Sequence, residues 1–65
     1  MKPILSKIHI QTKKRALAMA DYLAEYGIDV LEVMIKEDGN STIHCVGDHD
    51  QMRNIINQFN EDYNE

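Results

Sequence analysis

Three histidines and one cysteine are the side chains of this 65-residue chain best suited to metal or nucleophilic chemistry. His9 and His44 become neighbours if the strands that carry them are adjacent, and two imidazoles are part of a zinc site. Such a site needs three or four ligands, often at CxxC or HxxxH spacing, and neither spacing occurs here. Cys45 alternates away from His44 along the chain, and His49 begins a predicted helix. We therefore expect surface histidines, no metal and no cofactor.

The chain also lacks the residue patterns of common enzymes. It contains no P-loop, no GxSxG and no Ser-His-acid set in a recognisable context. A domain of this size has little room for a deep pocket. We predict that the protein is not an enzyme.

Charge is distributed unevenly along the sequence. Residues 1–15 carry five cations and no acid, whereas the other residues carry eleven acids and two cations, so charges of +5 and −9 give the net −4. Because most of the chain repels a phosphate backbone, nucleic acid is disfavoured as the partner. Lys13, Lys14 and Arg15 occupy a predicted first helical turn, where they either receive an anion or are simply solvated.

The expected compartment is the cytoplasm. The single cysteine cannot form an intramolecular disulfide, and the sequence shows neither a signal peptide nor an apolar run long enough to span a membrane. We therefore expect a reducing environment and no membrane partner.

A β-hairpin over residues 29–46 is the element around which the other segments are arranged. Residues 30–36 and 41–46 alternate between apolar and polar positions, and residues 38–40 offer a turn with a central glycine. A lone hairpin is marginal in water, so helices must cover its apolar side.

The flanking segments supply one more strand and two helices. Residues 4–10 alternate as a strand, and a helix is expected from an N-cap at Thr12 to about Tyr26, closed by Gly27. A second helix follows Asp48, with a clear apolar stripe. The buried stripe expected for the first helix is Ala16, Leu17, Ala20, Leu23 and Ala24. The expected core is Leu17, Leu23, Val33, Ile35, Ile43, Ile55, Ile56 and Phe59.

This order predicts a single α+β domain over residues 1–65, a two-layer β-α-β-β-α fold with both helices on one sheet face. A mostly antiparallel sheet in the order 1-3-2 is preferred to parallel pairing of the first two strands, because it splits the β-α-β unit as ferredoxin-like folds do. The other face of the sheet then has no cover. The residues expected on this open face are Leu5, Lys7, His9, Val30, Glu32, Met34, Lys36, Thr42, His44 and Val46.

Two surfaces are candidates for binding a protein partner. The open face is more apolar than a fully solvated face needs to be, which is typical of contact sites but also occurs by chance. The acidic end of the second helix is the other candidate, although a frayed terminus explains it equally well. The predicted partner-binding residues are Leu5, Val30, Met34, His44 and Val46 on the open face, and Glu61 and Asp62 on the helix.

The C-terminal stretch Ser41–Glu65 contains a strand, a glycine, a polar helix start, an Arg-x-Ile-Ile step and an acid–aromatic ending. With the predicted element order, it resembles the DinI family of DNA-damage-response regulators. The resemblance implies binding to RecA recombinase filaments through an acidic helix that mimics DNA, with Glu61, Asp62 and Glu65 as the acids and Asp50 as a further candidate. The run Ala24–Val30 also resembles ACT-type regulatory domains, which have a fourth strand that this sequence lacks.

The function favoured by the sequence is therefore a small acidic protein-binding module, an inhibitor or modulator of a larger cytosolic machine of the kind that phages encode against host or defence systems. The alternatives are a DinI-like modulator of RecA filaments and an ACT-like domain that binds a small ligand. A homodimer that forms through the open face is a further alternative.

Overall fold

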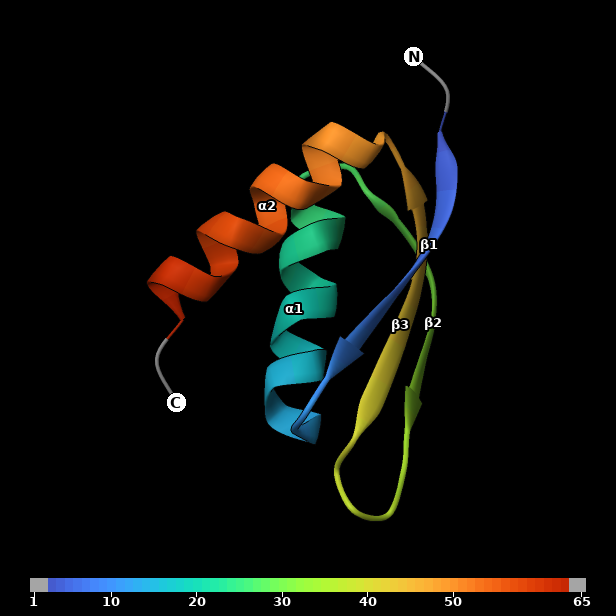
Figure 1. Ribbon diagram of the computed structural model, residues 1–65, viewed down its shortest axis with the longest axis vertical. Coiled ribbons are helices and arrows are strands. Elements are labelled where there is room, and N and C mark those ends of the chain that lie inside the picture. The colour runs from blue at the N-terminus through green and yellow to red at the C-terminus, as the bar shows by residue number, and fades with distance from the viewer. Residues whose placement is uncertain (1–2, 64–65) are drawn as a thin grey trace.

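The computed structural model describes residues 3–63 and has the predicted element order (Figure 1). Each of its helices and strands lies within two residues of the bounds that the sequence indicated. The elements are β1 (Ile4–Ile10), α1 (Lys13–Glu25), β2 (Asp29–Ile35), β3 (Ser41–Gly47) and α2 (His49–Asp62).

The sheet is antiparallel throughout, in the order β1-β3-β2, which confirms the predicted topology. Figure 1 shows the sheet nearly edge-on with both helices on the same side, so the fold is the expected two-layer α+β arrangement. Helix α1 lies along the sheet, whereas α2 diverges from the sheet towards its C-terminal end (Figure 1). None of the helices in residues 3–63 has the length and apolar character needed to cross a membrane.

Local interactions explain where the helices begin and where the hairpin turns. The side chain of Thr12 accepts a hydrogen bond from the backbone N–H of Arg15 at 3.2 Å, and Asp48 caps α2 in the same way through Gln51 at 3.0 Å. Gly39 has a φ of 93°, and this positive value is what the turn between β2 and β3 requires.

The core lies between the sheet and the two helices, and its centre was predicted correctly. The buried apolar side chains are Ile10, Ala16, Met19, Leu23, Ile28, Ile43, Cys45, Met52, Ile55 and Phe59. Val33 and Ile56 are partly buried against this cluster. Among these, Leu23, Ile43, Ile55 and Phe59 were expected to be buried, and they are.

Two of the predicted core residues are wrong. Leu17 is 45% exposed and Ile35 is 39% exposed. In α1 the buried stripe runs through Ala16, Met19 and Leu23, so the helix is rotated relative to the expected stripe and Met19 takes the place given to Leu17. Ala24 is exposed for the same reason.

A β-bulge in β2 overturns the predicted face of two side chains. Val30 pairs with Cys45 and Glu32 with His44, which leaves Leu31 as an extra residue in the strand. Val30 therefore packs against the core and does not lie on the open face, as the alternation had indicated. Leu31, expected inside, is 57% exposed.

Candidate functional site: the open face of the sheet

The open face of the sheet is the side that no helix covers in residues 3–63, and the strand register arranges its side chains in rows. Two rows form its middle: Lys7, His44 and Glu32 lie side by side, as do His9, Thr42 and Met34. A third row, at the end of the face near the N-terminus of β1, is formed by Leu5, Val46 and Asp29.

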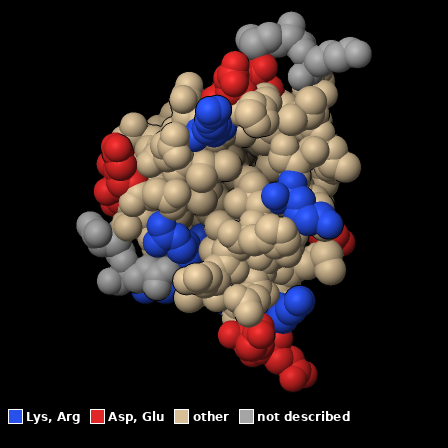
Figure 2. Space-filling view, in the orientation of Figure 1, with Lys and Arg blue, Asp and Glu red and all other residues tan. Residues whose placement is uncertain are grey.

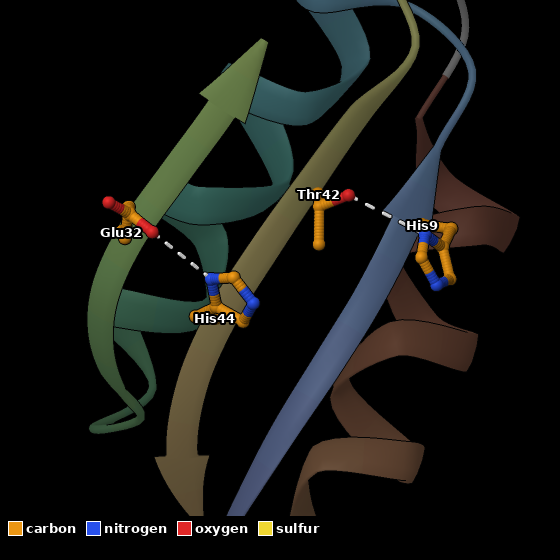
Figure 3. A network of polar contacts seen from close by, with 4 residues as sticks. All are labelled: His9, Glu32, Thr42 and His44. Carbon is orange, nitrogen blue, oxygen red and sulfur yellow. Dashed lines mark hydrogen bonds and ion pairs between the residues drawn. The ribbon is translucent and has the colours of Figure 1, made fainter.

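Polar side chains interact across the middle of this face. In Figure 3, which looks onto the open face with the helices behind the sheet, Nδ1 of His44 lies 3.3 Å from Oε1 of Glu32. Nδ1 of His9 lies 3.5 Å from Oγ1 of Thr42 (Figure 3). The side chain of His44 is only 24% exposed, and it makes this contact with Glu32 close to the surface of the sheet.

His9 and His44 lie in neighbouring rows of the open face. They interact with different partners, and within residues 3–63 no group of three or more histidine, cysteine or acidic side chains is placed to hold a metal ion. His49 lies at the start of α2, where its Nδ1 is 3.5 Å from Oδ1 of Asp50.

Exposed apolar side chains of the open face lie in different rows, and Leu31, the extra residue of the bulge, is exposed next to Glu32. Leu5, 68% exposed, lies beside the half-buried Val46 at one end of the face, while Met34, 52% exposed, lies in the row of His9 and Thr42. The polar row that contains His44 lies between Leu5 and Met34. An interface on this face therefore has both apolar and polar contacts, a mixture that is ordinary for protein–protein interfaces.

The acidic candidate residues lie on the other layer of the molecule. Glu61 and Asp62 are exposed at the C-terminal end of α2, where Nε2 of Gln58 donates a hydrogen bond to Oδ2 of Asp62 at 2.8 Å. Asp50 is exposed near the opposite end of the same helix, and Glu65 lies outside the described residues. The fold thus keeps the two predicted partner-binding surfaces apart.

The basic first turn of α1 has a structural role that the sequence did not reveal. Nη2 of Arg15 donates a hydrogen bond to Oδ1 of Asn60 at 2.7 Å, and its guanidinium lies 5.4 Å from the ring centre of Phe59 and 5.3 Å from that of Tyr63. Arg15 therefore links the start of α1 to the end of α2. Lys13 and Lys14 are exposed.

Cys45 and Tyr22 both have pKa values raised above their ordinary values. The thiol of Cys45 is fully buried, and desolvation raises its pKa, so it is held in the weakly nucleophilic protonated form. The pKa of Tyr22 is raised to about 12, chiefly by a hydrogen bond with Tyr26, then by desolvation and by the negative charges of Asp62 and Glu25. Tyr22 therefore remains protonated at neutral pH and cannot serve as a base.

The sequence matches no protein-family model and no curated protein, and the fold matches no solved structure.

Proposed function

We propose that the chain is a non-catalytic protein-binding module, an inhibitor or modulator of a larger machine, and that its partner binds the open face. The observation that supports this proposal is the exposure of Leu5 and Met34 on a face that carries an ordered polar row between them. Because the backbone of the sheet is already ordered, a partner that covers these side chains does not have to order it. The polar row fixes how the partner is positioned on the face, because His44 and Glu32 need hydrogen-bonding partners once water is removed.

Substitution of Met34 by aspartate provides the direct test. The partner is first recovered by affinity purification, and its affinity for the purified chain is then measured by calorimetry at low and high salt. We expect Met34→Asp to weaken binding by at least tenfold, because it places a charge in a desolvated contact. The affinity of the unmodified chain should change little with salt, since apolar burial is not screened.

Two control variants separate the open face from other surfaces. Leu17→Asp adds a charge at an exposed leucine on α1 and should leave binding unchanged. The double variant Glu61→Lys/Asp62→Lys reverses the acidic end of α2 and should also have little effect. Binding that survives Met34→Asp but is lost on charge reversal would reject the open face. A dimer of the chain that Met34→Asp dissociates would show that the second copy occupies this face.

The acidic end of α2 supports a second candidate, a DinI-like modulator of RecA filaments. What favours it is that Glu61 and Asp62 are exposed while Ile55 and Phe59 on the same helix are buried, so the acids are accessible without disturbing the core. Cosedimentation with RecA filaments tests this candidate. We expect binding that weakens steeply between low and high salt and is lost in Glu61→Lys/Asp62→Lys. Binding that Met34→Asp abolishes instead would contradict it.

A further inference from the structure

The outer edge of β1 borders a groove that adjoins the open face at His9. Among the described residues, β1 pairs only with β3, so alternate residues of β1 direct their backbone N–H and C=O groups away from the sheet. On the helix side of this edge lies a groove of about 410 Å³ between β1, α1 and α2. It exists because α2 diverges from the sheet towards its C-terminal end (Figure 1).

The groove has an apolar floor and a polar rim. Ile8, Ile10, Met19 and Ile56 line it, and Ile8 and Ile56 are only partly buried, so apolar surface remains accessible there. Arg15 and Asn60, which are joined by a 2.7 Å hydrogen bond, also line the groove. An added strand beside β1 would place every second side chain over this floor and the alternate side chains beside Lys7 and His9 on the open face.

The positive charge near β1 indicates which kind of ligand strand would bind beside it. Lys7 lies in the middle of β1 and Arg15 lines the groove, and residues 1–15 contain no acid. Figure 2, in the same view as Figure 1, shows basic side chains around a broad uncharged area, with the acidic ones at its outline. An acidic strand is therefore the complementary ligand.

A second copy of the chain is a poor match for the same edge. If two β1 strands paired antiparallel over their full length, Lys7 of one copy would lie opposite Lys7 of the other, and Leu5 opposite His9. Like charges directly opposite each other destabilise a strand pair. The basic segment around each β1 would add to this repulsion.

We propose that the edge of β1 and the adjoining groove bind an extended segment of a partner protein as a fourth strand, one in which apolar and acidic side chains alternate. The backbone groups of β1 supply the hydrogen bonds, the groove takes the apolar side chains, and Lys7 faces the acidic ones. This surface shares Lys7 and His9 with the open face but uses neither Leu5 nor Met34, so the inference does not rest on the apolar contacts proposed for that face.

Four short peptides with blocked ends test the inference against the full-length chain, with amide NMR and hydrogen exchange as the readouts. The peptide of alternating valine and glutamate should bind and slow the exchange of β1 amides. The peptides of alternating valine and lysine, alternating serine and glutamate, and the valine–glutamate peptide with a central proline should each bind at least tenfold more weakly. The lysine peptide lacks the negative charge, and the serine peptide lacks the apolar side chains. The proline peptide lacks one backbone N–H donor in its centre.

Two matched charge reversals locate the binding site. Lys7→Glu should weaken binding of the valine–glutamate peptide about two- to fivefold, the scale expected for exposed cross-strand charge pairs. Lys14→Glu makes the same change in net charge on the side of α1 opposite its buried stripe, and should change affinity less than twofold. Met34→Asp should leave peptide binding unchanged, which separates this site from the open face.

Several results would overturn the inference. Equal binding of the lysine or proline peptide, no binding of the valine–glutamate peptide, or amide shifts centred on β2 would each reject it. A single-stranded oligonucleotide that shifts the β1 amides more strongly than the peptide would assign the site to nucleic acid. Slow exchange of the β1 amides without peptide, in a chain that sedimentation shows to be a dimer, would assign it to a second copy.

Discussion

Two leucines on the same helix provide the sharpest test of how α1 is oriented. Leu23 is 0% exposed and Leu17 is 45% exposed, although the sequence indicated that both are buried. Leu23→Ala removes a fully enclosed side chain, which costs about 3–5 kcal/mol when the cavity persists. Leu17→Ala removes a side chain that is already half in water, which costs about 1 kcal/mol or less and is partly offset by the better helix propensity of alanine.

The expected difference between the two variants is therefore at least about 2 kcal/mol, from the same chemical change in the same helix. Urea unfolding followed by circular dichroism measures it, and with a slope of roughly 1 kcal/mol per molar urea the midpoints should differ by about 2 M. A domain of this size has only about 3–10 kcal/mol of stability, so Leu23→Ala is expected to be partly unfolded without urea. Equal midpoints for the two variants, or a lower midpoint for Leu17→Ala, would refute the orientation of α1.

Three further predictions concern the core, the thiol and the turn. Phe59, 3% exposed, packs against the rings of Tyr22 on α1 and Tyr63 just after α2, so Phe59→Ala should lose about 3–5 kcal/mol in urea unfolding. An unchanged melting temperature would show that α2 is not docked. Cys45 should react with iodoacetamide at pH 8 far more slowly in the folded chain than in urea, because burial raises its pKa; mass spectrometry measures the rates, and equal rates would contradict the buried position. The pKa of Asp38 is lowered, first by the backbone N–H of Asn40, so its ionised form stabilises the fold above the unfolded pKa of about 4, and this contribution is lost as pH falls through the folded value. Asp38→Ala should therefore lower the urea midpoint at pH 7 but not at pH 2, and a difference that persists in acid would contradict the linkage.

The element order and the sheet order could be predicted because the local signals agree with each other. The turn at Gly39 sits between two alternating runs, and Thr12 and Asp48 both act as the helix caps that their residue types indicate. The crossover and the hairpin also allow parallel pairing of the first two strands, and the 1-3-2 order is preferred because it splits the β-α-β unit as ferredoxin-like folds do.

The faces of individual side chains could not all be predicted, for identifiable reasons. The bulge at Leu31 has no glycine or proline to indicate it, and one extra residue reverses the face of Val30. In α1, Leu17 and Met19 lie on opposite sides of Ala16 around the helix, and the packing against the sheet and α2 buries Met19. The flexible side chain of methionine suits such an irregular space, but its place is decided by contacts between elements.

The contact between Arg15 and α2 lies beyond local sequence reasoning as well. Arg15 and Asn60 are far apart in the chain, and a cation in a first helical turn is ordinarily solvated. Glu32 and His44 pair in the same register as Val33 and Ile43, on the turn side of the bulge, so their adjacency follows from the hairpin and does not depend on the bulge.

The position of β3 between the two other strands also bears on how the chain folds. The hairpin closes a short loop, with Ile35 opposite Ser41, whereas β1 must find a partner much further along the chain, with Ile4 opposite Gly47. Loop-closure entropy grows with the length of the intervening chain, so local contacts form at a lower entropic cost than distant ones. We therefore expect β2 and β3 to pair early and β1 to join them late, after α1 has formed. We also expect local opening of the native state to release β1 before the hairpin, which amide hydrogen exchange would measure.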